Sequence, residues 1–164
     1  MAQRIIARQL GVPSAAATIG HDALGRPLLE RPGGTKLHLS LATRAGLVAV
    51  ALAERPVGID VELVDLARPP PLAALHREEA AMLLGLPESA RPLAFARLWS
   101  AKEAYVKALG TGFVRSPDSF AITLTTPERF AVTDVVLGST RQGMGRTIEN
   151  GGQEILAAAM IVLD

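Results

Sequence analysis

The sequence predicts an α+β fold for a single domain of 164 residues. Short segments with strand-like patterns form two groups, at residues 37–64 and at residues 120–163. Helical patterns precede the first group and separate the two, so helices and strands are segregated along the chain, which is typical of α+β proteins. The hydrophobic fraction of 49% is sufficient for a core without metal or disulfide support, and the chain has no cysteine.

The first part of the chain is predicted to form a short helix, a turn region and three strands. Residues 3–10 have helical apolar spacing and end at Gly11, a helix stop signal. Residues 20–36 are rich in glycine and proline and are expected to form turns. Three strands, expected to be neighbours joined by tight loops, follow at residues 37–42, 47–52 and 57–64.

The second part is predicted to form helices and then further strands. The prolines of residues 67–72 exclude a helix or a central strand there. The remaining elements follow in order: helices at residues 77–84 and about 92–109, the latter ending at Gly110 and Gly112, strands at 120–125, 130–137 and 154–163, and glycine-rich turns at 138–146 and 149–152.

Charge and hydropathy disfavour two classes of partner. The net charge is +1 and no basic cluster exceeds two neighbours, which argues against binding to nucleic acid by charge. The longest apolar run, residues 155–163, is too short to span a membrane, and the N-terminus has no signal-like apolar region. We therefore expect a soluble, cytoplasmic protein that binds neither nucleic acid nor membrane.

Asp60 and Glu62 form a carboxylate pair on the strand predicted at residues 57–64. Because they are two residues apart, both side chains point to the same face of the strand. Adjacent carboxylates repel each other unless solvent or a cation compensates, and Mg²⁺ prefers such oxygen ligands. The pair is consistent with a magnesium site, but a solvated edge face, where D-x-E is common, is the more usual reading of the pair taken alone.

Glu103 and Lys107 lie one turn apart on the helix predicted at residues 92–109. In this order, such a pair stabilises an exposed helix by roughly 0.2–0.5 kcal/mol. Trp99 lies one turn before Glu103 and is expected to pack the helix on the sheet, while Lys102 lies beside the same face. The pattern fits a surface ion pair as well as a functional site.

The segments VGIDVE (57–62) and WSAKEAYVK (99–107) together resemble the two signature motifs of the 4′-phosphopantetheinyl transferase superfamily. The family pattern is G-[IV]-D-[IV]-E followed, some forty residues later, by [FW]-[SCT]-x-K-E-[AS]-x-x-K, and every position is met. Three further segments resemble the longer, surfactin-synthetase-associated branch: GRPLL (25–29), LHLSLATRAGL (37–47) and KALGTGF (107–113).

The resemblance implies a fold of small antiparallel sheets packed with helices in a pseudo-two-fold arrangement. Within the single domain, residues 1–55 are expected to form a shortened first half, and residues 56–164 a second half with the metal site. In this family the active site lies between the halves. A shortened first half leaves both a monomer and a dimer open.

The activity implied by the resemblance is transfer of the phosphopantetheine arm of coenzyme A to a serine of an acyl or peptidyl carrier protein, with release of adenosine 3′,5′-bisphosphate. The same resemblance implies the site residues, which are as follows: Asp60, Glu62 and Glu103 as Mg²⁺ ligands, Glu103 as acceptor of the serine proton, Lys107 as catalytic lysine on the pyrophosphate, and Lys102 and Arg26 as further coenzyme A contacts.

One departure from the family pattern concerns coenzyme A binding. Ala42 and Thr43 stand where the longer branch has Ser-His, whose histidine binds the 3′-phosphate of coenzyme A. Threonine donates one hydrogen bond but carries no charge, so we expect weaker binding or a substitute cation such as Arg44 or His38. The alternative to a transferase is therefore a catalytically silent relative that binds coenzyme A or a carrier protein. The three carboxylates and two lysines favour the enzyme.

Overall fold

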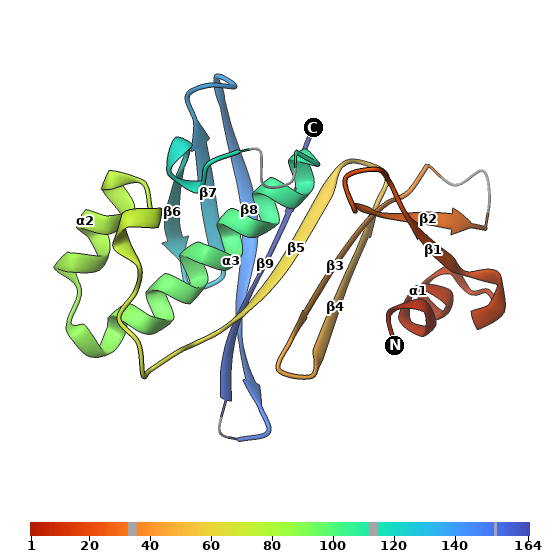
Figure 1. Ribbon diagram of the computed structural model, residues 1–164, viewed down its shortest axis with the longest axis horizontal. Helices are drawn as coiled ribbons and strands as arrows, with labels where there is room; N and C mark the ends of the chain where they lie inside the picture. Colours follow the sequence, from red (N-terminus) through yellow and green to blue (C-terminus); the bar gives the residue numbers. More distant parts are fainter. Residues whose placement is uncertain (33–35, 112–114, 153) are drawn as a thin grey trace.

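The computed structural model describes residues 1–32, 36–111, 115–152 and 154–164 (Figure 1). The helices and strands are α1 (Ala2–Leu10), β1 (Thr18–His21), β2 (Pro27–Arg31), β3 (His38–Arg44), β4 (Leu47–Ala53), β5 (Val57–Leu63), α2 (Arg77–Gly85), α3 (Arg91–Leu109), β6 (Ala121–Thr126), β7 (Arg129–Asp134), β8 (Ser139–Asn150) and β9 (Glu154–Val162). Within these residues the strands form two hairpins, β1–β2 and β3–β4, and a five-stranded sheet in the order β5-β9-β8-β7-β6. All the pairings are antiparallel. The predicted α+β class is confirmed.

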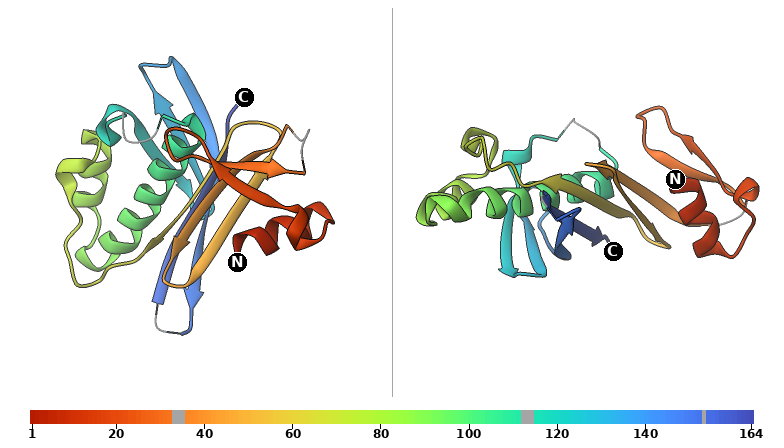
Figure 2. Two further views of the ribbon diagram at one scale, coloured as in Figure 1. Left: turned by 45° about the vertical axis from the view of Figure 1, so that its right-hand side comes forward. Right: turned by 90° about the horizontal axis from the view of Figure 1, so that it is seen from below.

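The main core lies between α3 and one face of the five-stranded sheet, which the helix crosses obliquely (Figures 1 and 2). Leu98 and Tyr105 of α3 are buried against Phe120, Val132 and Ile161. Burial of each such side chain contributes about 1.5–3 kcal/mol, so this layer holds α3 firmly on the sheet. Helix α2 lies beside α3 at the outer end of this layer.

A second core lies under the N-terminal elements. Ile6 and Ala7 of α1 pack against Ala17 and Leu39, and α1 ends at Gly11, whose φ of 66° is the left-handed conformation of a helix C-cap. The β3–β4 hairpin lies beside β5 (Figure 1), with Ala42 buried against Val61 and Leu156. The N-terminal part is thereby attached to the five-stranded sheet.

Most predicted elements are confirmed within a few residues, and the strand predicted at 57–64 lies beside the two preceding strands, as expected. Its ladder partner was not predicted, because β5 hydrogen-bonds along its length to β9. Residues 154–162 are almost wholly apolar and suit a central strand buried on both faces, which the sequence could not assign to one particular neighbour.

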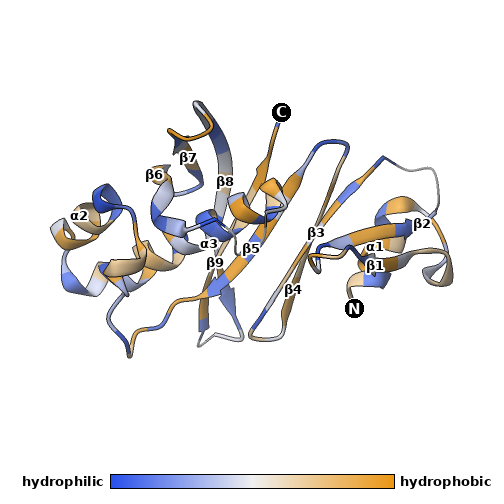
Figure 3. Cartoon of the chain, turned by 45° about the horizontal axis from the view of Figure 1, so that its top comes forward, coloured by the Kyte–Doolittle hydropathy of each residue, from blue (hydrophilic) through white to orange (hydrophobic). Residues whose placement is uncertain are grey.

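Two regions predicted as turns contain strands. Residues 22–26 form the turn of the β1–β2 hairpin, in which the carboxylate of Asp22 accepts hydrogen bonds from the amides of Leu24 and Arg26, and residues 33–35 of the predicted turn region lie outside the described residues. Residues 138–146, predicted as a glycine-rich turn, mostly belong to β8, which is largely hydrophilic (Figure 3). Gly143 is needed there because a side chain would overlap the ring of Phe130.

The predicted end of the long helix is partly described. Helix α3 ends at Gly110, whose φ of 69° is again left-handed, as expected. Gly112 and Phe113, in the glycine turn used for the family resemblance, lie outside the described residues. Among the residues that are described, we find no helix long and apolar enough to cross a membrane.

Candidate active site

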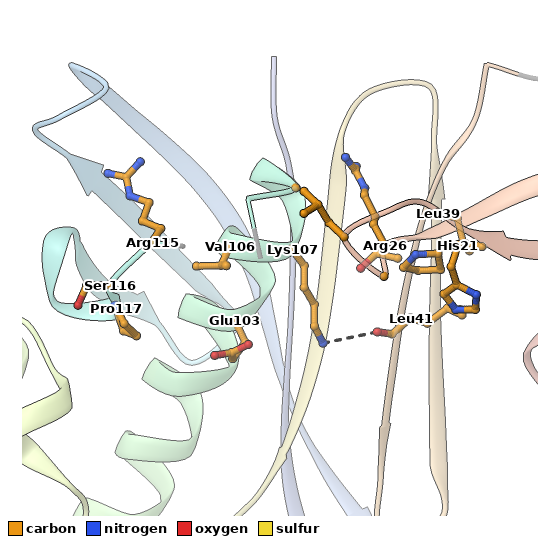
Figure 4. Close-up of a pocket in the computed structure, with 15 residues that line it drawn as sticks. His21, Arg26, Leu39, Leu41, Glu103, Val106, Lys107, Arg115, Ser116 and Pro117 are labelled. Atoms are coloured by element: carbon orange, nitrogen blue, oxygen red, sulfur yellow. Dashed lines mark hydrogen bonds between the residues drawn. The ribbon is translucent and has the colours of Figure 1, made fainter. Parts of the chain in front are cut away.

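A cavity of about 650 Å³ lies between the N-terminal elements and α3 (Figure 4). The β1–β2 hairpin and β3 form one side, the C-terminal half of α3 the second, and residues 115–117 the third. The polar side chains that line it are those of His21, Arg26, Ser40, Glu103, Lys107, Arg115 and Ser116. It is therefore a partly apolar cavity with several cationic groups.

Lys107 joins three elements at the site, α3, β5 and β3. Its Nζ lies 2.6 Å from Asp60 Oδ1 of β5 and donates to the carbonyl oxygens of Ile59 at 3.3 Å and Leu41 at 3.5 Å (Figure 4 marks the Leu41 contact). Helix α3, strand β5 and strand β3 thus meet at one ammonium group. Glu103, one turn earlier on α3, faces the same cavity, as the spacing predicts.

Gly58 allows the helix to approach the strand that carries Asp60. On β5, Gly58 and Asp60 share the face that is turned towards α3. A side chain at position 58 would overlap the carbonyl oxygen of Ala104 and lie 2.7 Å from the amide nitrogen of Ala108. The glycine of the G-x-D-x-E segment is therefore required for close contact between the two elements that carry the site.

The three predicted metal ligands are close enough to affect one another electrostatically. Burial raises the pKa of Glu103, and the charge of Asp60 raises it further. Burial and Asp60 likewise raise the pKa of Glu62, which also forms an ion pair with Arg44 at 3.7 Å. Asp60 Oδ2 is buried and accepts no hydrogen bond in the described part of the chain. The carboxylates thus carry negative charge that the surroundings compensate incompletely.

These observations fit a cation but do not complete a metal site. In the described ranges, no three carboxylate or imidazole groups are gathered closely enough to hold an ion. Asp60 Oδ1 is instead engaged by the ammonium of Lys107. The metal role of Asp60, Glu62 and Glu103 stays a prediction.

Arg26, which the resemblance implies as a coenzyme A contact, lies in the cavity wall. The Asp22 turn fixes its backbone, and its guanidinium lies against Gly110 at the end of α3. Its Nη2 is buried and lacks a hydrogen-bond partner among the described residues. A buried cationic donor without an acceptor is suited to an anionic ligand.

Three other predicted coenzyme A contacts lie elsewhere. Thr43 and Arg44 are exposed near the end of β3 and do not line the cavity. The prediction for Lys102 is corrected, because its side chain is 1% exposed and points into the core. There Nζ pairs with Glu79 and donates to two backbone carbonyls, and burial lowers its pKa against the opposing effect of Glu79. Lys102 has no proton left for a phosphate.

Two basic side chains that line the cavity, those of His21 and Arg115, were not predicted as site residues. His21 is opposite Pro27 in the β1–β2 hairpin, so recognising this hairpin would have placed it beside Arg26. Arg115 follows the glycine turn after α3 and donates to Asp134 Oδ1 at 2.6 Å and to Ser119 Oγ at 3.3 Å. In the sequence, the position of a basic residue shortly after the glycine turn was the signal that could have identified Arg115.

Comparison with known proteins gives the family. The model of the 4′-phosphopantetheinyl transferase superfamily matches residues 56–158. The chain is 31% identical over 133 residues to the 4′-phosphopantetheinyl transferase HetI of Nostoc sp.. This match covers 76% of this chain and 55% of HetI. It is 28% identical over 127 residues to the 4′-phosphopantetheinyl transferase psf-1 of Bacillus pumilus. That match covers 75% of this chain and 52% of psf-1.

The chain spans about half the length of the curated relatives it matches. Among solved structures, the holo-[acyl-carrier-protein] synthase of Thermotoga maritima aligns with 66% of this chain and 64% of its own, at a TM-score of 0.43 and 20% identity. With the family model matching well over half of its residues and both predicted motifs inside the matched region, the chain belongs to the 4′-phosphopantetheinyl transferase superfamily.

Proposed function

We propose that this chain transfers the 4′-phosphopantetheine arm of coenzyme A to the serine hydroxyl of an acyl or peptidyl carrier protein. The observation that carries the proposal is the meeting of Asp60, Glu103 and Lys107 beside a cavity of about 650 Å³. A cavity of this size accommodates an organic ligand, and its cationic groups suit phosphates. Family membership supports the same reaction.

In the proposed reaction the serine oxygen attacks the phosphorus that carries the pantetheine arm. A new P–O bond forms, the phosphoanhydride bond breaks, and adenosine 3′,5′-bisphosphate leaves. Enzymes accelerate such a displacement mainly by positioning the reactants and by neutralising charge. Lys107 would bind the pyrophosphate and stabilise the charge that moves onto the leaving group.

Glu103 would accept the serine proton. Burial and the neighbouring charge of Asp60 raise the pKa of Glu103, which makes it a stronger proton acceptor than an exposed carboxylate. It faces the cavity from the same side of α3 as Lys107. The proton acceptor and the phosphate-binding cation would therefore be held one helical turn apart.

Asp60, Glu62 and Glu103 would hold Mg²⁺. The buried, unpaired Oδ2 of Asp60 and the raised pKa values of the two glutamates support this assignment, because a divalent cation would relieve the local negative charge. Carboxylate oxygens are also the ligands that Mg²⁺ prefers. When bound, the ion supplies neutralisation of charge on the pyrophosphate.

Arg26 and Lys107 are the proposed coenzyme A contacts with the strongest support, since both line the cavity. His21 and Arg115 join them as candidates for a phosphate of the nucleotide. Thr43 and Arg44 would reach coenzyme A only if the bound nucleotide extended beyond the cavity wall.

Intact-mass spectrometry of apo carrier proteins tests the function. The carrier is incubated with this protein, coenzyme A and Mg²⁺, with EDTA and a carrier lacking the acceptor serine as controls. A mass gain of one phosphopantetheine that both controls abolish is expected. No gain with fatty-acid, polyketide and peptide carriers, while coenzyme A still binds, would indicate the catalytically silent relative.

A further inference from the structure

Lys102 and Glu79 form an ion pair that is completely enclosed in the protein. Each side chain is 1% exposed, and Lys102 Nζ lies 2.8 Å from Glu79 Oε1. Nζ also donates to the carbonyl oxygens of Pro117 at 2.6 Å and Phe120 at 2.8 Å. The three protons of the ammonium thus have three protein acceptors.

The carboxylate of Glu79 also accepts two hydrogen bonds from backbone amides. Its Oε1 accepts from the amide of Ile122 at 2.6 Å, and its Oε2 accepts from the amide of His76 at 2.9 Å at the start of α2. The pair therefore joins α2, α3, the edge strand β6 and the segment before β6. These elements lie together at one end of the molecule (Figure 1).

The segment that Lys102 holds is part of the cavity wall. Residues 115–117 line the cavity, and the carbonyl oxygen of Pro117 is the closest partner of Nζ. Glu103, the next residue of α3, faces the cavity (Figure 4). Successive helix residues point about 100° apart, so an anchored side chain at 102 fixes the direction of the one at 103.

Stability alone does not account for the pair. Replacing a buried ion pair by apolar groups of similar volume is often neutral or stabilising, because charges are costly to remove from water. What the ammonium offers beyond an apolar side chain is fixed geometry, since its three bonds join α3 to α2 at Glu79 and to the segment before β6 at Pro117 and Phe120. A methionine would fill the same space and fix none of them.

We infer that Lys102, paired with Glu79, is a positioning residue that sets the cavity wall at Pro117 and the direction of Glu103. This inference rests on the proposed function for its effect on catalysis, but not for its effect on the wall. Under this inference Lys102 and Glu103, which are adjacent in the sequence, have different roles. Lys102 acts through the structure, whereas Glu103 faces the substrate.

The test compares Lys102→Met combined with Glu79→Gln against Leu83→Ala. Leu83 is fully buried one turn after Glu79 on α2 and does not line the cavity, so its truncation destabilises the same region without touching the wall. Lys102→Met alone would strand a buried carboxylate and is avoided. Lys102→Gln combined with Glu79→Gln, which leaves no buried charge and offers two side-chain donor protons at position 102 where the ammonium has three, is the fallback if the first double variant does not fold.

Two readouts separate positioning from general loss of stability. The amide of Ser119 donates to the carbonyl of Ser116, a hydrogen bond that spans Pro117 of the wall and has neither Lys102 nor Glu79 as its partner. Its hydrogen exchange is expected to be faster in the double variant and unchanged in Leu83→Ala. The KM for coenzyme A is expected to rise about tenfold in the double variant only, with a fall in kcat, because small displacements at a reaction centre are costly.

Unchanged exchange at Ser119 in the double variant would overturn the inference, as would an equal rise in KM in Leu83→Ala. The exchange readout does not depend on activity. If the wild-type protein transfers nothing to any carrier, the proposed function fails while the exchange comparison still decides whether Lys102 positions the wall.

Discussion

Asp60 is the residue around which the candidate site is organised. One of its oxygens binds the ammonium of Lys107, and the other is buried without a hydrogen-bond partner in the described chain. An unsatisfied buried oxygen typically costs about 1–3 kcal/mol, more when it is charged. A fold retains such a group where a ligand satisfies it, which is why Asp60 is the strongest single indication of a cation site here.

Lys107 is expected to compete with a divalent cation for Asp60. In Lys107→Met the carboxylate loses its ammonium partner, so Mn²⁺ should bind the free protein about tenfold more tightly, equivalent to about 1.4 kcal/mol. Mn²⁺ titration followed by electron paramagnetic resonance measures this. Lys36→Met, which removes an exposed lysine far along the chain from both motifs, is the control. Equal affinity in the wild type and Lys107→Met would contradict competition at Asp60.

At the scale of elements, the site depends on the contact between β5 and α3. Gly58→Ala would push the helix away from the strand, and overpacking of this kind costs about 1–3 kcal/mol or more. We expect a clear drop in the free energy of unfolding, measured by urea denaturation, together with loss of transfer. Gly145→Ala is the matched control, because a side chain there would lie 3.6 Å from the carbonyl oxygen of Ala158, an ordinary contact. Equal stabilities of the two variants would disprove the close packing.

A second connection joins α3, β7 and the cavity wall through Asp134. It is buried, and its carboxylate accepts hydrogen bonds from Tyr105, Arg115 and the amide of Leu137. Burial would raise the pKa of Asp134, but these bonds and the charge of Arg115 lower it below the ordinary value of 3.8. Burial and the bond to Asp134 also raise the pKa of Tyr105 to about 12, so the phenol stays a donor at neutral pH.

The lowered pKa of Asp134 determines how the stability of the fold depends on pH. Since folding lowers the pKa of Asp134, ionisation stabilises the fold above pH 3.8, and this stabilisation is lost as the pH falls towards the lower folded-state pKa. Asp134→Asn should therefore cost about 3 kcal/mol at neutral pH, and the difference from wild type should shrink below about pH 4. Urea denaturation between pH 7 and pH 3 measures it, with the exposed Glu128→Gln as control. A constant difference across this range would refute the assignment.

At the scale of the whole molecule, the cavity forms where N-terminal elements meet α3. Arg26 comes from the β1–β2 hairpin and reaches the end of α3 near Gly110. Arg26→Met should weaken coenzyme A binding about tenfold, the effect of losing one charged hydrogen bond. Isothermal titration calorimetry measures this, with the exposed Arg4→Met of α1 as control. Unaltered affinity would show that the nucleotide binds elsewhere.

The sequence was a good guide to helices and to the site motifs, and a poor one to strand partners. The long helix has a clear stop signal at Gly110, and the D-x-E and E-x-x-x-K spacings fix which side chains share a face. Strand pairing depends on contacts distant in sequence, so the partnership of β5 with β9 was invisible. Glycines that serve packing, such as Gly143, were mistaken for turn glycines.

Lys102 shows the same limit within the site itself. Spacing alone put it beside Glu103 and Lys107, but helical position does not reveal that a buried carboxylate lies on the far side. Only the location of Glu79 on another helix distinguishes a lysine that binds a phosphate from one that supports the fold. The burial of Lys102 could therefore not be predicted from the sequence pattern, whereas the shared face of Glu103 and Lys107 could, and both line the cavity.

The measurement that tests the central claim most directly is phosphopantetheine transfer by Glu103→Gln next to the wild type, followed by the intact mass of an apo carrier protein. Removing the proton acceptor should lower the rate by a factor of about 10²–10⁴, while thermal melting stays close to that of the wild type. Transfer by the wild type with this loss in Glu103→Gln is the result predicted. Transfer at an undiminished rate in Glu103→Gln would contradict the account of the site.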